Sequence, residues 1–220
     1  MITELTGFVL AGGKSSRMGT DKAALSLGGR TLLETALTVV RSVAKEVFIL
    51  GSPEIYGSCG PTIADIFPGC GPLGGIHAAL SHVAKISQTT NPAQAQPAEP
   101  QHPSPKLSLI LAVDTPFITV EFLNYLAERA TASGAVVTTP EIDAYPQPLC
   151  TVYSLDFLPI AEQALKAGNY KIVPLFPKDK TLLITEAEVR RFAFPAEMFE
   201  NLNTPEDLDR ARRRSSRTDL

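Results

Sequence analysis

Apolar runs alternate with segments of helical periodicity along most of the chain. The apolar runs, which favour buried strands, lie at residues 7–10, 47–50, 107–113, 135–138, 149–153 and 181–185. Helix-like spacing is found at residues 31–43, 72–85, 120–133 and 155–166, and again after residue 204. This alternation is typical of a mostly parallel sheet covered by helices on both faces. We therefore predict one doubly wound α/β domain over residues 1–220.

Local signals sharpen this outline. Thr31 and Glu34 have the spacing of a capping box, in which a hydroxyl and a carboxylate cap the first turn of a helix reciprocally. Residues 107–113 are almost continuously apolar, so their strand is expected near the middle of the sheet, where both faces are buried. Thr204 and Pro205 suit the N-cap and the first position of a helix, which by itself explains both residues.

Residues 87–105 differ in composition from the rest of the chain. They consist mainly of Gln, Thr, Asn, Ala and Pro, with few side chains that could be buried. Such a segment does not gain enough from burial to offset the entropy of ordering it. We therefore predict a disordered insertion within one domain, because long polar surface loops add little to the free-energy cost of folding. A segment that docks on a partner is the alternative.

Charge and cysteine content exclude several classes of function. The net charge is −3, so no overall basic field indicates nucleic acid or an anionic membrane as a partner. We interpret residues 212–220 as a flexible basic tail at the end of a helix. Without a secretory leader or an apolar stretch of about twenty residues, the protein is expected in the cytoplasm. Cys59, Cys70 and Cys150 are too scattered for a disulfide framework or a zinc site, and are expected as free thiols.

A glycine-rich loop follows the first apolar run. Residues 10–22 have the sequence LAGGKSSRMGTDK. At the carboxyl end of a buried strand such a loop presents backbone N–H groups to an anion, and Gly12 and Gly13 allow a ligand to approach closely. Arg17 offers a planar fork for phosphate oxygens, while Lys22 offers a compact positive charge. The loop matches neither the ATPase P-loop nor the GxGxxG dinucleotide fingerprint, yet its composition predicts a phosphate-binding site.

Asp114 follows the most apolar strand, at the edge where open α/β sheets bind ligands. A carboxylate at this edge is a candidate ligand for Mg²⁺. An Asx-type turn formed with Thr115 and Pro116 explains the same residue equally well, so the local sequence leaves both interpretations open.

The chain resembles the molybdenum cofactor guanylyltransferases, a MobA-type family of nucleotidyltransferases, at motifs distributed over almost its whole length. These motifs are the loop at 10–22, GPLGG at 71–75, DTP at 114–116, QPL at 147–149 and NLNTPE at 201–206. The resemblance implies a Rossmann-like nucleotidyltransferase fold and transfer of GMP from GTP to the terminal phosphate of molybdenum-loaded molybdopterin, with release of pyrophosphate. It therefore implies GTP and a molybdopterin-type acceptor as substrates, and proteins of molybdoenzyme maturation as partners.

The resemblance also implies roles for individual residues. Arg17 and Lys22 would hold the triphosphate and stabilise the departing pyrophosphate, and Asp114 would ligate the Mg²⁺ cofactor. The nucleotide would contact Leu10, Ala11, Gly12, Gly13, Lys22, Ser52, Asp65 and Asp114. The acceptor would contact Gly74, Gly75, Asn201 and Asn203, although both asparagines could instead shape the turn before the last helix.

Base specificity rests on two places in the chain. Related cytidylyltransferases tend to carry alanine in place of the first glycine of the Gly12-Gly13 pair, so the resemblance implies that this pair favours guanine. The family often has an asparagine-type contact after the second strand, where this chain has Leu50-Gly51-Ser52. That contact is therefore either missing or supplied by Ser52.

Two other functions compete with the guanylyltransferase. One is a nucleotidyltransferase of the same fold with another base or acceptor, such as a pterin cytidylyltransferase or a sugar-phosphate enzyme. The other is a noncatalytic protein that carries a nucleotide or a pterin. Arg17, Lys22 and Asp114 argue against the carrier, because pure binding does not require two phosphate-side cations together with a metal carboxylate.

Overall fold

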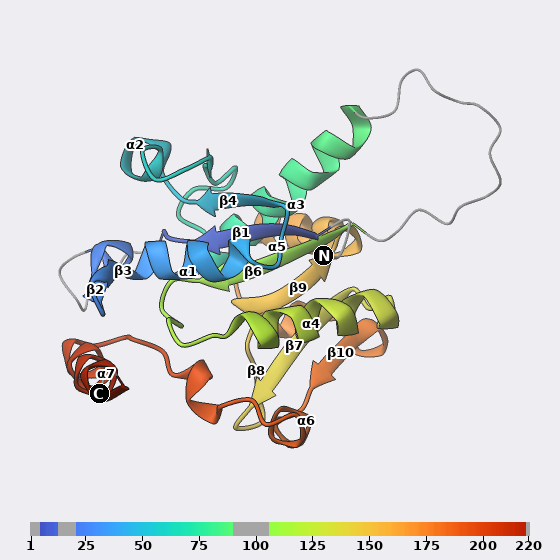
Figure 1. Cartoon of the computed structure of the whole chain (residues 1–220). Helices are drawn as coiled ribbons and strands as arrows, with labels where there is room; N and C mark the ends of the chain where they lie inside the picture. The colour runs from blue at the N-terminus through green and yellow to red at the C-terminus, as the bar shows by residue number, and fades with distance from the viewer. Residues whose placement is uncertain (1–4, 13–20, 90–105, 219–220) are drawn as a thin grey trace.

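The computed structural model describes residues 5–12, 21–89 and 106–218 (Figure 1). Within these residues an 8-stranded sheet forms the centre, with strand order β10-β7-β9-β6-β1-β4-β5 and with β8 paired to β7. Its strands are β1 (Leu5–Leu10), β4 (Glu46–Leu50), β5 (Thr62–Ile63), β6 (Leu107–Ala112), β7 (Val137–Ile142), β8 (Tyr145–Pro146), β9 (Cys150–Ser154) and β10 (Thr181–Ile184). Strands β2 (Ser26–Leu27) and β3 (Arg30–Thr31) form a separate antiparallel pair.

Helices cover both faces of the sheet. They are α1 (Leu32–Arg41), α2 (Pro53–Tyr56), α3 (Pro72–Thr89), α4 (Val120–Ser133), α5 (Leu158–Lys166), α6 (Glu186–Arg191) and α7 (Pro205–Thr218). Helices α1 and α4 pack on the face at the front of Figure 1, and α3 and α5 pack on the opposite face. Each face has its own hydrophobic core: Val9 belongs to the first and its neighbour Phe8 to the second, because successive side chains of a strand point to opposite faces.

The direction of the strands confirms the predicted fold class. Strand β1 is parallel to β4 and to β6, and β5 and β10 are parallel to β4 and β7. Strand β9 is antiparallel to both β6 and β7. Only residues 143–149 separate β7 from β9. A parallel connection needs about a dozen residues or more, so this short segment forces the chain to reverse direction.

The local sequence signals are found in the structure. Strand β6 lies in the middle of the sheet, and all of its residues are buried. The capping box is complete, because Thr31 Oγ1 accepts from the Glu34 backbone N at 3.1 Å and the Glu34 carboxylate accepts from the Thr31 backbone N at 2.7 Å. At α7, Thr204 Oγ1 accepts a hydrogen bond of 3.1 Å from the backbone N of Asp207, as expected of an N-cap.

Several element boundaries differ from those predicted. Helix α1 ends at Arg41 and β7 begins only at Val137. Helix α4 ends at Ser133 as predicted, followed by Gly134 in a left-handed conformation with φ of 63°. Helix α3 continues to Thr89, so residues 87–89 are helical and do not belong to a disordered insertion. The remainder of that prediction, residues 90–105, lies outside the described residues. Residues 212–218 are part of α7 and do not form a tail beyond it.

Gly7 lies where β1 passes beneath α1, and its lack of a side chain is required there. A Cβ atom at this position would lie 2.3 Å from Val40 Cγ1 and 3.0 Å from Ala44 Cβ. We expect Gly7→Ala to lower the free energy of unfolding by about 1–3 kcal/mol, because overpacking forces neighbouring atoms apart. Val40→Ala removes the nearest atom, so the double variant should lose less stability than the two single variants summed. Urea denaturation of the four proteins measures this coupling, and strict additivity would contradict the packing described.

Candidate active site

The carboxyl ends of four parallel strands meet at one edge of the sheet. Strand β1 is followed by Ala11, β4 by Gly51, β5 by Ala64 and β6 by Val113. Sheet-like hydrogen bonding continues past the ends of the strands, since the backbone N of Val113 donates to the carbonyl of Leu10 at 3.2 Å. This edge is where open α/β sheets bind their ligands.

The start of the glycine-rich loop is bound to the neighbouring strand. The backbone N–H groups of Ala11 and Gly12 both donate to the carbonyl of Leu50, at 3.1 and 3.3 Å. The prediction that the loop offers its N–H groups to an anion is therefore wrong for these two residues. A Cβ atom at Gly12 would meet the protein only at ordinary contact distance, 3.5 Å from Gly51 Cα. Packing within the described protein thus does not require glycine there, which leaves room for a ligand.

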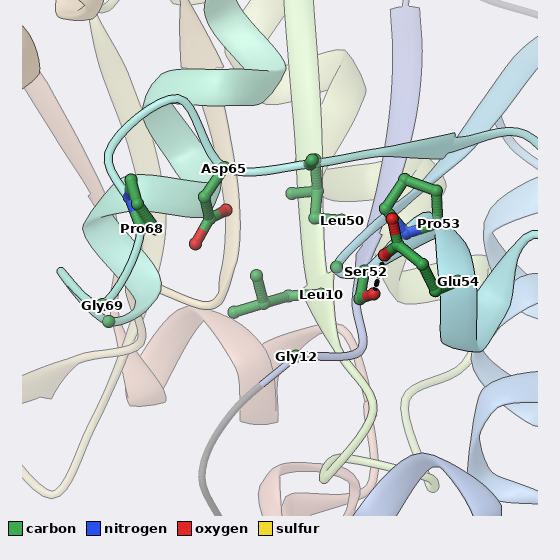
Figure 2. A pocket seen from close by; sticks show the side chains of 12 residues that line it. Leu10, Gly12, Leu50, Ser52, Pro53, Glu54, Asp65, Pro68 and Gly69 are labelled. Atoms are coloured by element: carbon green, nitrogen blue, oxygen red, sulfur yellow. Dashed lines mark hydrogen bonds between the residues drawn. The ribbon is translucent and has the colours of Figure 1, made fainter.

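A cavity of about 590 Å³ opens beside these strand ends (Figure 2). Its lining consists of Leu10, Gly12, Leu50, Gly51, Ser52, Pro53, Glu54, Ala64, Asp65, Pro68, Gly69 and Gly71. In Figure 2, Asp65 lies on one side of Leu10 and Leu50, and the pair Ser52 and Glu54 lies on the other. An apolar floor with a few polar groups at its sides is typical of small-molecule sites. The structure therefore brings four predicted nucleotide residues, Leu10, Gly12, Ser52 and Asp65, to one cavity.

Asp65 is half-buried at the side of the cavity, and burial raises the pKa of its carboxyl above the ordinary value. No hydrogen bond to this carboxylate is found among the described residues. A Cβ atom at Gly74 would lie 3.3 Å from Asp65 Oδ2, and one at Gly75 would lie 2.6 Å from Leu10 Cδ1. The Cβ at Gly74 would also lie 2.9 Å from the carbonyl oxygen of Phe67, so Gly74 makes room for that carbonyl and for Asp65, and Gly75 makes room for Leu10. The contact of both glycines with an acceptor stays a prediction.

Ser52 reaches the cavity together with a carboxylate that the sequence did not single out. The Ser52 hydroxyl donates to the Glu54 carboxylate, and this hydrogen bond lowers the pKa of Glu54. The Ser52 hydroxyl therefore already donates its proton to a protein group, whereas the ionised Glu54 can accept hydrogen bonds from a ligand. Helix α2 has one turn, too short for a periodic pattern that could have drawn attention to Glu54.

Lys22, Asp114 and Asn203 meet at the same edge, although they come from the beginning, middle and end of the chain. The ammonium of Lys22 donates to Asn203 Oδ1 at 2.7 Å and lies 3.5 Å from Asp114 Oδ2. The side chains of Lys22 and Asp114 are only 19% and 23% exposed. The backbone N of Leu202 donates to the carbonyl of Asp114 at 2.8 Å, which holds the segment before α7 against the end of β6.

The two predicted asparagines have different surroundings. Asn203 accepts a hydrogen bond from Lys22, so its side chain belongs to the cluster that it forms with Lys22 and Asp114. Its backbone N donates to the Asp207 carboxylate at 2.9 Å and thereby also shapes the turn before α7. Asn201 lines a second cavity of about 390 Å³ together with Glu200, Leu202, Asp207, Arg210 and Arg214.

The predicted site residues Gly13 and Arg17 lie outside the described residues, so their roles stay predictions.

Within the part of the chain that the structure describes, no group of three or more His, Cys, Asp or Glu side chains could hold a metal ion. A single carboxylate nevertheless suits Mg²⁺, which is usually bound through one or two carboxylates together with water and substrate phosphates. Asp114, partly exposed beside Lys22, has the oxygen chemistry that such a site requires.

No described helix has the length and apolar character needed to cross a membrane.

Comparison with known proteins agrees with this geometry. The fold is similar to that of 2-C-methyl-D-erythritol 4-phosphate cytidylyltransferase from Thermus thermophilus, with a TM-score of 0.61 at 18% identity over 95% of this chain and 98% of that chain. The architecture is that of the α/β nucleotidyltransferases. Residues 7–179 match the model of the MobA-like NTP transferase domain. The chain belongs to this family.

Two relatives are similar over nearly the whole chain. A probable molybdenum cofactor guanylyltransferase from Pelotomaculum thermopropionicum is 33% identical over 211 residues, which cover 95% of this chain and 92% of the relative. The crystal structure of molybdopterin-guanine dinucleotide biosynthesis protein A from Archaeoglobus fulgidus has a TM-score of 0.76 at 25% identity, covering 96% of this chain and 99% of that one.

The raised pKa of Asp65 predicts a pH dependence of stability. Because burial disfavours the charged form, the stability that the protonated carboxyl provides is lost as the pH rises through its raised pKa. Asp65→Asn should therefore raise the free energy of unfolding at neutral pH, and this gain should fade below the ordinary carboxyl pKa of about 3.9. Chemical denaturation at neutral pH and at a pH below the ordinary carboxyl pKa measures the free energies of unfolding of the variant and of the unaltered protein. Glu128→Gln, at an exposed position of α4, is the control, and a gain independent of pH would contradict the prediction.

Proposed function

We propose that the protein transfers GMP from GTP to the terminal phosphate of a molybdopterin-type acceptor and releases pyrophosphate. The observation that supports this best is the meeting of Lys22, Asp114 and Asn203 at the edge of the sheet that also carries the cavity of about 590 Å³. We call this cavity the nucleoside cavity, because we propose that the nucleoside of GTP binds there. A cation for phosphates, a carboxylate for a metal and a pocket for a nucleoside are the parts that nucleotidyl transfer needs. Guanine as the base and molybdopterin as the acceptor are inferred from the names of the relatives.

The reaction needs positioning and neutralisation of charge more than it needs a protein nucleophile. An oxygen of the acceptor phosphate attacks the α-phosphorus of GTP, and the bond between this phosphorus and the bridging oxygen of pyrophosphate breaks. The acceptor phosphate is already largely ionised, since its second pKa is about 6, so no strong base is required. Lys22 balances the charge that develops on pyrophosphate, and Asn203 holds its ammonium in place. Mg²⁺ bound at Asp114 would supply further neutralisation of the phosphate oxygens.

The nucleoside cavity favours a ligand with several hydrogen-bond donors. Asp65 and Glu54 place a carboxylate on each side of the apolar floor formed by Leu10 and Leu50. Guanine carries N–H donors on two neighbouring positions of its pairing edge, and the ribose carries two hydroxyl groups. Acceptor groups on both sides of a cavity suit such a ligand, which supports guanosine. We also propose that the product passes to proteins of molybdoenzyme maturation.

The proposed substrates can be identified in one end-point assay. We expect the protein, supplied with Mg²⁺, molybdenum-loaded molybdopterin and GTP, ATP, CTP or UTP separately, to form a dinucleotide only from GTP. Chromatography identifies the product and enzymatic detection of pyrophosphate measures its release. A dinucleotide from CTP would instead support the pterin cytidylyltransferase, and nucleotide binding without any product would support another acceptor or a carrier.

The role of Asp114 is tested by replacing it with alanine. Because Asp114 is the proposed metal carboxylate, Asp114→Ala should lower the rate of transfer at least about a hundredfold while the protein stays folded. The initial rate and the midpoint of thermal unfolding are measured together. Asp179→Ala removes an exposed carboxylate from a distant turn and serves as the matched control. Ordinary activity of Asp114→Ala would remove this residue from the proposed mechanism.

A further inference from the structure

Tyr56 joins the nucleoside cavity to the phosphate-side lysine. It ends the short helix α2, belongs to none of the sequence motifs of the site, and is only 6% exposed. Its hydroxyl lies 2.8 Å from Asp21 Oδ2 and 3.2 Å from the carbonyl oxygen of Ala11. The single phenolic proton is therefore shared between two acceptors. One of them directly follows a residue of the cavity floor, Leu10, and the other directly precedes Lys22.

Asp21 continues this connection to Lys22. While Asp21 Oδ2 accepts from Tyr56, Asp21 Oδ1 accepts from the backbone N of Ala23 at 3.0 Å. That second bond caps the 3-10 turn of Lys22–Ala24, so the carboxylate fixes the backbone from which the Lys22 side chain extends. The hydroxyl of Tyr56 thus acts on Lys22 through Asp21, and it does not itself reach the ammonium.

The neighbourhood of Tyr56 is shaped around its ring. A Cβ atom at Gly51 would lie 2.8 Å from two ring carbons of Tyr56, so the residue after β4 must be glycine for the ring to occupy its place. Burial and the Asp21 carboxylate raise the pKa of the phenol, which therefore keeps its proton for donation. A hydrogen bond from a neutral donor to a carboxylate is stronger than one between neutral groups.

We propose that Tyr56 is a positioning residue whose hydroxyl fixes the distance between the nucleoside cavity and the ammonium of Lys22. This inference rests on the proposed function, because it assumes a ligand with a nucleoside at one end and phosphates at the other. A nucleoside triphosphate must fill both places at once, so a variable distance between them weakens its binding. A nucleoside monophosphate lacks the distal phosphates and does not depend on that distance.

Tyr56→Phe separates this role from packing, since it removes the hydroxyl and keeps the ring. We expect the variant to bind GTP about tenfold more weakly, as measured by calorimetry with Mg²⁺, and to bind GMP as the unaltered protein does. The rate of transfer at saturating acceptor should fall together with the affinity for GTP. Tyr145→Phe, which removes a hydroxyl from an exposed tyrosine of β8, is the matched control and should change none of these values.

The outcomes distinguish this inference from the function on which it rests. Equal weakening of GTP and GMP binding, with a lower midpoint of thermal unfolding, would show that the hydroxyl has only a structural role and would overturn the inference. Unchanged affinity for both nucleotides would overturn it as well, while product formation by the unaltered protein would leave the proposed function standing. An unaltered protein that binds no nucleoside triphosphate would overturn both.

Discussion

Parallel pairing of β1 with both β4 and β6 is the constraint on which the site depends. Because the three strands run in one direction, the segments that follow them emerge at the same edge of the sheet. One strand end leads into the glycine-rich loop, another forms a wall of the cavity, and the third is followed by Asp114. Antiparallel insertion of β9 on the far side of β6 does not disturb this edge, since β9 contributes none of the residues placed there.

Electrostatics divides the site into two parts. The cavity presents the carboxylates of Asp65 and Glu54 above apolar residues, whereas Lys22 supplies positive charge beside Asp114. A nucleoside with neutral donor groups matches the first part, and an anionic phosphate chain matches the second. Asp114 balances the charge of Lys22 in the structure. In the proposed reaction, a polyphosphate with its metal ion would offer each of them a new partner of opposite charge.

The residues of the site that lie in recognisable motifs could be predicted, whereas Glu54 and Tyr56, which lie outside those motifs, could not. Asp114 and Lys22 follow strands with clear apolar patterns, so their edge of the sheet was predictable. Tyr56 acts through a hydrogen bond to a residue 35 positions away, which leaves no periodic trace in the sequence. The antiparallel direction of β9 could have been inferred from its short connection to β7. The pair β2 and β3 has a readable signal too, the Gly28-Gly29 turn.

The contact between Lys22 and Asn203 spans 181 positions of the sequence. Leu202, the neighbour of Asn203, is in turn bonded to the backbone of Asp114. On the ribosome, strands β1 to β9 and both charged residues are therefore synthesised well before the asparagine that contacts the lysine. A nascent chain can therefore assemble much of the sheet while the contact between Lys22 and Asn203 is still missing, so this contact is among the last features of the site to form. Loss of the residues from Leu202 onward would for the same reason remove the hydrogen-bond partner of Lys22 while leaving every strand of the described sheet in the chain.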